Sequence, residues 1–453
     1  MNSNKKILFS LEIILIFLLA FSSFFFVFNI VSLSVVIDIQ LVLYLFVVLF
    51  NYSRVKTFNI YQIWIVAYIF IVWAEMRIIS TESYANPYIR FTLSNCFVLL
   101  GYHLYQGGKK ISSVKVRYLS KTNWTFTFFL VLLYVLYIAL SANSALANFQ
   151  SGRQLSDAKG STSLTGVLIG ALGTLLPVLI AYYLKYVKGK NNIVSFIICL
   201  PIFIIVLLQS TRFKFLFTVL PYLIVIDLFS LGISSVKKNV VMLVIAFLLV
   251  GISSFVKENR NTAFLEIEKK SIIETSNTND SDPFTLKLAK NMSPEGVVYM
   301  ANVADNYFSN HSLHWGKEMS FVLYFWIPRA IWPNKPTQLD YWLIREYSSE
   351  TVASTYSSAS GFIGEARADF GWGCLLFALL IGMLFRRIDG YKTIVWSQHS
   401  DSLNIILVAI AVPWAFFFVR SPLTSTMSLI WELVIYYFFI RLFSLPISSK
   451  NKN

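Results

Sequence analysis

Charged residues are scarce in this chain: Asp, Glu, Lys and Arg make up 13% of its 453 residues, whereas hydrophobic residues make up 56%. In soluble domains about a quarter of the residues are charged, so this composition argues against an ordinary soluble fold. Acidic residues are the scarcer sign, and the formal net charge is +15. In a soluble domain this charge would favour nucleic-acid binding. Here we expect no nucleic-acid partner, because the cytoplasmic loops of membrane proteins carry an excess of Lys and Arg.

Cysteine and the common catalytic motifs are also missing or rare. The three cysteines, Cys96, Cys199 and Cys374, lie in apolar stretches and form no CxxC pair, which argues against a disulfide framework or a zinc site. The chain has no Walker loop, GxSxG elbow or HExxH motif, which disfavours ATPases, serine hydrolases and zinc proteases. His311 and His314 have no third ligand nearby in the sequence. We therefore expect neither a metal nor a cofactor.

What the chain does contain is a series of about a dozen apolar runs, each close to the roughly 20 residues that a membrane-spanning helix needs. The first run is long and lacks a small-residue cleavage pattern, so we expect a span and not a removable signal peptide. The fold class predicted is an all-α polytopic membrane protein with about 12 transmembrane helices. The predicted spans are 7–28, 31–50, 59–78, 88–106, 124–144, 164–184, 193–209, 214–234, 239–255, 370–385, 403–419 and 425–445.

The distribution of basic residues predicts the orientation of these spans. If the N-terminus is cytoplasmic, nineteen Lys and Arg fall on inward segments, and four fall on short outward segments. The four are Arg153, Lys159, Arg212 and Arg420. By the positive-inside rule both termini are cytoplasmic. The predicted organisation is nine spans in 1–255, an outward loop over 256–369, called the long loop below, and three spans in 370–453.

The long loop contains a predicted helix. Ser293 is a suitable N-cap, Pro294 suits the first helical position and Glu295 the first turn. The apolar residues between 297 and 308 then recur on one face. This pattern predicts a short amphipathic helix that packs over the spans.

The next segment, 321–336, is apolar, rich in proline and too short to span a membrane. Its prolines exclude a continuous helix, and Trp326 and Trp332 suit the level of the lipid headgroups. We therefore predict a re-entrant or interfacial segment. Arg329 and Lys335 would then be either interfacial anchors or ligands for an anionic phosphate, and the sequence leaves both interpretations open.

The last part of the loop, 357–373, is rich in small residues. Gly361 and Gly364 would let a sugar ring or a lipid phosphate approach the backbone. Glu365 and Asp369 are spaced i, i+4 and share one helix face. They are either carboxylates of a site or a pair that caps free N–H groups at a helix start.

At this point the residues resemble a known family, the Wzy O-antigen polymerases. The resemblance rests on Pro328-Arg329, Trp332-Pro333 and Lys335-Pro336, followed by Gly361, Gly364-Glu365, Phe370-Gly371 and Gly373. It covers about 50 residues in motif, 327–373, and the whole chain in the order of spans and loop. Asp369 stands where the family has Asn ahead of the Phe-Gly pair.

The resemblance implies a GT-C-like glycosyltransferase in the bacterial inner membrane. Such an enzyme transfers a growing glycan from undecaprenyl pyrophosphate onto the non-reducing end of an incoming lipid-linked repeat unit, on the periplasmic face. It needs no nucleotide sugar. Its partners would be the lipid-linked oligosaccharide repeat units, membrane lipid and a membrane protein that regulates chain length.

The reaction requires cations for the departing pyrophosphate and a base for the acceptor hydroxyl. The candidate substrate-binding residues are Arg212, Lys214, Arg329, Lys335, Arg367 and Arg420. The candidate bases are Glu365, followed by Asp340 and His314. For Arg77 and Arg90, which flank the outer link after the third span, snorkelling to the interface is the favoured interpretation. Asp38, Asp227 and Glu432 lie within spans, where we expect them to pair with a buried hydroxyl or cation.

Two alternatives remain. An O-antigen ligase would use the same donor and a similar arrangement of spans. A flippase or transporter for lipid-linked sugar would place its charges in the middle of the bundle, whereas this chain concentrates them at the predicted outer face and in the long loop.

Overall fold

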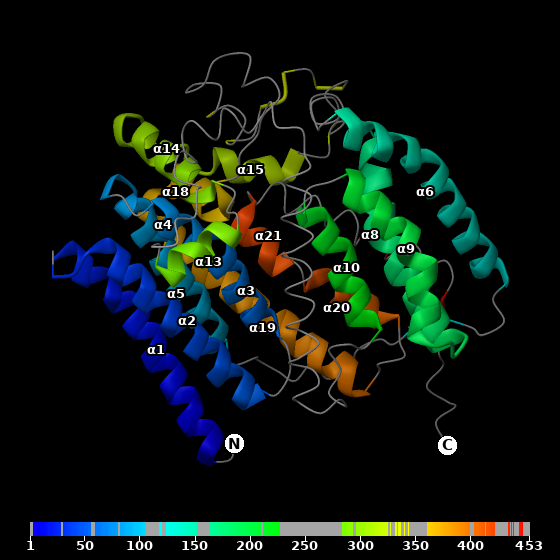
Figure 1. The fold of residues 1–453 in the computed structure, drawn as a ribbon, viewed down its shortest axis with the longest axis horizontal. Helices are drawn as coiled ribbons and strands as arrows, with labels where there is room; N and C mark the ends of the chain where they lie inside the picture. The colour runs from blue at the N-terminus through cyan, green and yellow to red at the C-terminus, as the bar shows by residue number, and fades with distance from the viewer. Residues whose placement is uncertain are drawn as a thin grey trace. The chain divides into compact units, whose positions relative to one another are not determined.

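The structure is a computed structural model. It describes residues 3–28, 30–55, 59–79, 82–105, 117–119, 124–151, 164–209, 212–226, 283–292, 296–324, 360–398, 403–412, 414–421 and 444–446, with isolated positions at 327, 331–332, 334–336, 339, 343, 434, 436 and 438. These residues are almost entirely helical, which confirms the all-α class (Figure 1). Two short strands, β1 (Arg117–Leu119) and β2 (Ser444–Pro446), pair antiparallel.

Five helical stretches are long and apolar enough to cross a membrane: 7–25, 33–53, 60–79, 124–143 and 361–395. Shorter apolar helices cover 172–187, 192–208 and 404–420. Each of these stretches overlaps a predicted span. The predicted span at 88–106 is helical too, but it is more polar. The predicted spans at 239–255 and, for most of its length, at 425–445 lie outside the described residues.

The chain divides into two compact units. The first comprises 1–108, 262–387 and 414–426, and the second comprises 109–261, 388–413 and 427–453. The helices of the long loop thus belong to the same unit as the first spans.

The first unit begins with four predicted spans, of which the third is interrupted by a π-helical turn. They are α1 (Ser3–Val27), α2 (Leu33–Val55), the continuous stretch α3 (Ile60–Tyr68), η1 (Ile69–Trp73) and α4 (Ala74–Ile79), and, after the short turn η2 (Glu82–Tyr84), α5 (Ala85–Leu104). A π-helical turn of this kind often lies near functional residues. Here it directly precedes Glu75 and Arg77, which both contact the long loop.

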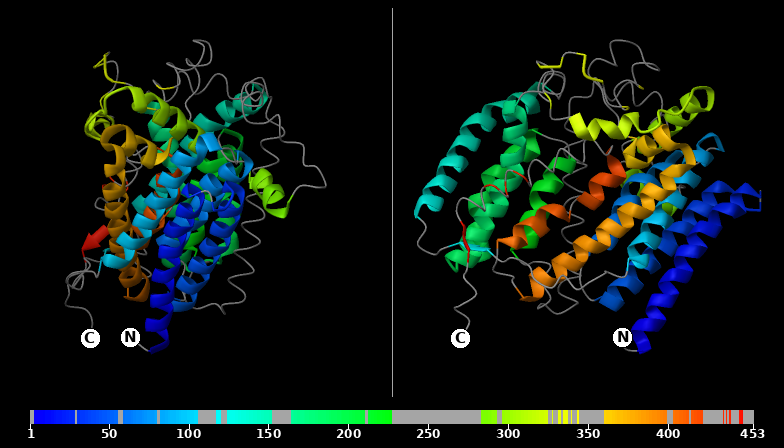
Figure 2. Two further views of the ribbon diagram at one scale, coloured as in Figure 1. Left: turned by 90° about the vertical axis from the view of Figure 1, so that its left-hand side faces the viewer. Right: turned by 180° about the vertical axis from the view of Figure 1, so that it is seen from behind.

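The remaining helices of the first unit come from the second half of the chain. They are α13 (Phe284–Met292), α14 (Val297–Asn310), α15 (Lys317–Tyr324), α18 (Gly361–Phe370), the 3-10 turn η5 (Gly371–Gly373), the first part of α19 (Cys374–Gln398) and α21 (Trp414–Arg420). Figures 1 and 2 show α14, α15 and α18 together at the end of this unit opposite the N-terminus. We call this the loop end of the first unit.

Helices α5 and α19 approach each other through glycines. A Cβ atom added at Gly101 would overlap the backbone carbonyl of Leu379, and one added at Gly382 would overlap that of Val98. Small residues permit this close packing of helix backbones in membranes. The contact places the start of α19, and with it η5, against α5.

Aromatic side chains form the core between α3, α18, α19 and α21. The ring of Trp64 lies 6.0 Å from that of Phe362 and 5.4 Å from that of Phe385. Phe418 contacts the same two phenylalanines, at 5.9 Å from each. Aromatic contacts of this type contribute beyond the area they bury, so α18 is held firmly on the spans.

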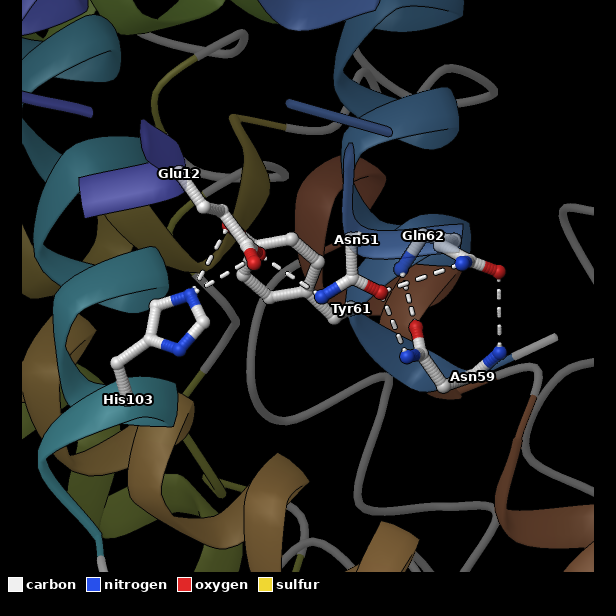
Figure 3. A network of polar contacts seen from close by, with 6 residues as sticks. All are labelled: Glu12, Asn51, Asn59, Tyr61, Gln62 and His103. Atoms are coloured by element: carbon white, nitrogen blue, oxygen red, sulfur yellow. Dashed lines mark hydrogen bonds and ion pairs between the residues drawn. The ribbon is translucent and has the colours of Figure 1, made fainter. Parts of the chain in front are cut away.

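At the opposite end of the first unit, a polar network connects α1, α2, α3 and α5 (Figure 3). Asn51 Nδ2 donates to Glu12 Oε1 at 2.8 Å, and His103 Nε2 lies 3.1 Å from the same oxygen. Asn59 Nδ2 in turn donates to Asn51 Oδ1 at 2.8 Å. Asn59 and Gln62 also form a capping box at the start of α3. The network therefore ties the start of α1 and α3 to the end of α2 and α5.

The second unit contains α6 (Trp124–Ser151), α8 (Leu164–Tyr182), the π-helical turn η3 (Tyr183–Val187), α9 (Asn192–Gln209), α10 (Arg212–Val225) and α20 (Asn404–Ala411), with the end of α19. Pro177, Pro201 and Pro221 lie inside α8, α9 and α10. A buried hydrogen bond of 2.9 Å between Ser195 and Tyr222 joins α9 to α10.

Candidate functional site

Helix α14 carries the predicted apolar face but not the predicted start. Met300, Ala304 and Phe308 are buried against Leu339, Leu343 and Ala368, so the amphipathic helix is confirmed. It begins at Val297, and its N-cap is Gly296, whose φ of 79° lies in the left-handed region. Gly296 provides no side-chain cap. The proposed cap Ser293 lies outside the described residues.

The cap of α14 comes from a predicted membrane span. The Glu75 carboxylate on α4 accepts hydrogen bonds from the backbone N–H groups of Val298 at 3.1 Å and Tyr299 at 2.8 Å. A carboxylate satisfies otherwise unpaired N–H groups at a helix N-terminus and interacts favourably with its dipole. Burial raises the pKa of the nearby Tyr84, with further contributions from Tyr299 and Glu75.

Asp369 caps α15 in the same manner. Its carboxylate accepts from the backbone N–H groups of Glu318 at 3.0 Å and Met319 at 2.8 Å. Of the two interpretations of the Glu365–Asp369 pair, capping is therefore the one that Asp369 follows, although it caps a different helix from its own. The end of α18 thus fixes the start of α15.

Two arginines share one carboxylate at the loop end of the first unit. Arg90 Nη1 on α5 is hydrogen-bonded to Asp305 Oδ1 on α14, and Arg367 Nε on α18 lies 3.2 Å from the same oxygen. The three side chains are 8%, 12% and 16% exposed, in the order Arg90, Asp305, Arg367. Two guanidinium groups against one carboxylate leave an excess positive charge in a largely shielded position. We call this group the arginine pair.

The arginine pair has unused hydrogen-bonding capacity. Arg90 Nε and Asp305 Oδ2 are buried and have no hydrogen-bond partner among the described residues. An unsatisfied buried polar group costs about 1–3 kcal/mol, and such groups need an explanation. Arg367 Nε also forms no hydrogen bond with a described residue, although it lies 3.2 Å from Asp305 Oδ1. Unused donors and an unused acceptor within one group of side chains fit a ligand that carries both an anionic oxygen and a hydroxyl group.

The turn after α18 borders the arginine pair. Gly371 has a φ of 59°, and a Cβ atom there would lie 3.4 Å from Arg367 Nη1 and 3.3 Å from Leu313. The next residue, Trp372, places its ring 4.9 Å from the Arg90 guanidinium, within the range of a cation–π contact. Gly371 therefore borders the Arg367 guanidinium, and Trp372 borders that of Arg90.

The chain matches no protein-family model, no curated protein and no solved structure with which it was compared. The interpretation of the site thus depends on its geometry and on the resemblance in the motif.

Three of the predicted site residues lie in or beside this region. Arg367 belongs to the arginine pair. His314 Nδ1 lies 2.8 Å from Glu318 Oε1, next to the α15 start that Asp369 caps. Glu365 is fully buried on α18, so a base at this position would reach a substrate only if the site opened.

The other predicted residues are placed differently. Lys335 donates to the Ile327 carbonyl at 3.0 Å and lies 5.0 Å from the centre of the Phe321 ring, so it connects Ile327 to α15. Arg420 donates to the neighbouring Ser421. Arg212 and Lys214 belong to α10 of the second unit, and their side chains are outside the described residues, as are Arg329 and Asp340.

The glycines of α18 do not have the predicted role. A Cβ atom at Gly361 would lie 2.5 Å from the Val419 carbonyl oxygen, and one at Gly364 would lie 2.5 Å from Cβ of Ser360. Both glycines are buried. They permit close packing within the protein, and the prediction that they admit a sugar or phosphate is wrong in this structure.

Arg77 and Asp38 tie α13 to the spans. Arg77 Nε lies 2.8 Å from Asp38 Oδ1, and Thr285 Oγ1 on α13 donates to Asp38 Oδ2 at 3.2 Å. The prediction that Asp38 pairs with a cation or hydroxyl is confirmed. For Arg77 and Arg90, however, the carboxylate partners Asp38 and Asp305 correct the simple snorkelling interpretation. Within the described ranges no group of three or more His, Cys, Asp or Glu residues could hold a metal ion.

Proposed function

We propose that this chain is an O-antigen polymerase, a membrane glycosyltransferase of the bacterial inner membrane. It would transfer a growing glycan from undecaprenyl pyrophosphate onto the non-reducing end of an incoming lipid-linked repeat unit, on the periplasmic face. The observation that carries the proposal is the arginine pair: Arg90 and Arg367 share the single carboxylate of Asp305 in a largely buried position. It lies beside residues of the motif that resembles this family.

The arginine pair suits the leaving group of this reaction. The acceptor hydroxyl oxygen attacks the anomeric carbon of the donor, and the bond from that carbon to the pyrophosphate oxygen breaks. The departing lipid pyrophosphate takes the electron pair, and the acceptor proton passes to a base. Arginine binds phosphate oxygens through paired N–H groups, and donors in a shielded site stabilise developing charge more strongly than donors in water.

The unused polar atoms fit the same substrate. Arg90 Nε would donate to a phosphate oxygen, and Asp305 Oδ2 would accept from a sugar hydroxyl. A phosphate diester oxygen can accept a hydrogen bond but cannot donate one, so it would use only the first of these atoms. A sugar joined to a pyrophosphate would use both.

Of the two candidate bases that the structure describes, Glu365 and His314, the second has the more suitable geometry. Its Nδ1 contact with Glu318, which is 4% exposed, orients the ring and selects the tautomer. Nε2 would then accept the proton of the acceptor hydroxyl. We expect His314→Gln to abolish extension in a purified system and Glu365→Gln to retain it. The reverse result would assign the base to Glu365.

The test of the function is the surface glycan of a deletion strain complemented with variants. Loss of a polymerase leaves one repeat unit on the lipid A core, whereas loss of a ligase leaves none. We expect Arg90→Ala and Arg367→Ala each to reduce extension about 10²–10³-fold, because each removes one donor to developing charge. Arg387→Ala is the matched control, since Arg387 is exposed near the end of the part of α19 that lies in the first unit. Normal polymer from both arginine-pair variants would refute the proposed site.

A further inference from the structure

We propose that Trp315, together with Trp372, forms an aromatic subsite that binds the pyranose rings of a glycan beside the arginine pair. This inference rests on the proposed function, which makes a lipid-linked oligosaccharide the substrate. It adds a binding surface for the sugar to the cation site for the pyrophosphate.

Trp315 has an unusual backbone conformation. Its φ is 51°, and it is the only non-glycine residue with a positive φ among the residues that the structure describes. This region is unfavourable for a bulky side chain, and residues held there concentrate at functional sites. Trp315 is nevertheless 77% exposed. The strained backbone conformation therefore does not serve to bury the indole.

The turn that carries Trp315 is fixed to the end of α18. The backbone N–H of His314 donates to the Ala368 carbonyl, and that of Trp315 donates to the Asp369 carbonyl, both at 3.0 Å. On the other side, the Asp369 carboxylate caps α15, which begins two residues later. The indole is therefore presented to solvent from a backbone held on both sides. An aromatic side chain on a fixed backbone loses less conformational freedom on binding than one on a mobile loop.

The same turn adjoins the arginine pair. Leu313, two residues before Trp315, and Arg367 Nη1 both lie within 3.4 Å of the Cβ position of Gly371. Trp372 follows Gly371, is 54% exposed and lies over the Arg90 guanidinium. The exposed indole of Trp372 thus belongs to the turn η5, which borders both arginines, and that of Trp315 belongs to the turn next to it.

An indole and a pyranose ring are chemically complementary. The face of the ring system is a large apolar surface with negative π density, and its N–H group can still donate a hydrogen bond. A pyranose presents C–H groups on its faces and hydroxyl groups at its rim. The arginine pair would bind the phosphates next to the first sugar, so the indoles lie where the first sugars of the glycan would extend.

The competing role for an exposed tryptophan in this chain is membrane anchoring at the headgroup level. Anchoring requires only that the indole reach the interface. It gives no reason for a left-handed backbone or for two hydrogen bonds to the end of α18. We therefore favour the glycan over the lipid, and the test distinguishes the two.

The experiment uses the purified full-length protein in detergent and the oligosaccharide repeat unit of the source cells, released from its lipid and free of pyrophosphate. Binding is measured by calorimetry and by saturation-transfer NMR. We expect Trp315→Ala to weaken binding about five- to tenfold, which corresponds to about 1–1.4 kcal/mol, and Trp315→Phe to recover part of it. Trp315→Gly should fold normally, because glycine adopts a positive φ without strain, and should also bind weakly. The control is Trp124→Ala, which removes an equally exposed indole from the start of α6.

Two results would overturn the subsite: a wild-type protein that does not bind the oligosaccharide, or unchanged oligosaccharide binding by Trp315→Ala. The second result would assign the indole to the membrane interface. The proposed function fails separately. A protein that binds the oligosaccharide through Trp315 but does not extend lipid-linked units would contradict the polymerase and leave the subsite intact.

Discussion

At the scale of single residues, Asp305 decides what the arginine pair can bind. Its Oδ1 contacts both guanidinium groups, and its negative charge offsets the repulsion between the two arginines. The same negative charge competes with an incoming phosphate. Asp305 thus positions the cations and at the same time lowers their affinity for anions. A substitution that removes its charge should therefore increase the affinity for anions.

We predict that Asp305→Asn binds inorganic pyrophosphate more tightly than the wild type. The amide keeps the shape and can accept a hydrogen bond from Arg90, but the charge is removed. The gain should be about 1–2 kcal/mol after screening in a partly exposed site, and it should shrink as salt is added. Calorimetric titration at two salt concentrations measures it. The matched control is Asp38→Asn, which changes a separate arginine–carboxylate contact, with Arg77. Equal affinity in wild type and Asp305→Asn would place the pyrophosphate elsewhere.

At the scale of elements, the long loop is held by carboxylates from other helices. Glu75 caps α14 and Asp369 caps α15, so the start of each loop helix depends on a residue from a different element. The period of apolar residues is a local signal, and it predicted the packed face of α14 correctly. The cap was not predictable in this way, because Glu75 lies 223 residues from Val298 in the sequence. Arg367 was a candidate from the sequence, but its link to Arg90 through Asp305 was missed for the same reason, since Arg90 and Asp305 are 215 residues apart.

Glu75 caps the N-terminus of α14, so its substitution should weaken the start of that helix. Glu75→Gln retains one acceptor oxygen but loses the charge that interacts with the helix N-terminus. We expect a loss of about 1–2 kcal/mol in the local stability of α14, seen as faster hydrogen exchange over residues 297–300. Ser309→Ala, at the exposed far end of the same helix, serves as the control. Unchanged exchange in Glu75→Gln would show that the cap does not stabilise the helix.

The close contact between α5 and α19 depends on the absence of a side chain at Gly101. Gly101→Ala adds a methyl group where the Leu379 backbone already lies, so the helices must move apart. We expect a loss of about 1–3 kcal/mol and a lower melting temperature in detergent. Gly390→Ala in α19 is the control, because nothing lies within 4 Å of its Cβ position. That variant should be neutral or slightly stabilising through helix propensity. Equal melting temperatures for the two variants would contradict the close packing.

At the scale of the whole molecule, the first unit has different chemistry at its two ends. The network of Glu12, Asn51, Gln62 and His103 joins four helices at one end (Figure 3). At the loop end lie the arginine pair and the two exposed indoles of Trp315 and Trp372. The alternation of apolar runs and basic segments predicts which segments share an end, because chain direction reverses at every span. It could not predict which side chains meet there, since that depends on the packing of helices distant in sequence.

The last prediction assigns these two ends to the two sides of the membrane. Helix α19 has 25 residues, and a helix rises about 1.5 Å per residue, so its two ends can reach opposite faces of a bilayer. The positive-inside rule places Arg387 on the cytoplasmic side and Asn310, at the exposed end of α14, on the other. We expect a membrane-impermeant maleimide added from outside to label Asn310→Cys and not Arg387→Cys, in a chain whose three native cysteines are replaced. If the maleimide labels both cysteine variants from the cytoplasmic side, which faces outward in inverted vesicles, the loop end lies on the cytoplasmic side. This result would place the arginine pair away from the face on which the proposed polymerase must act.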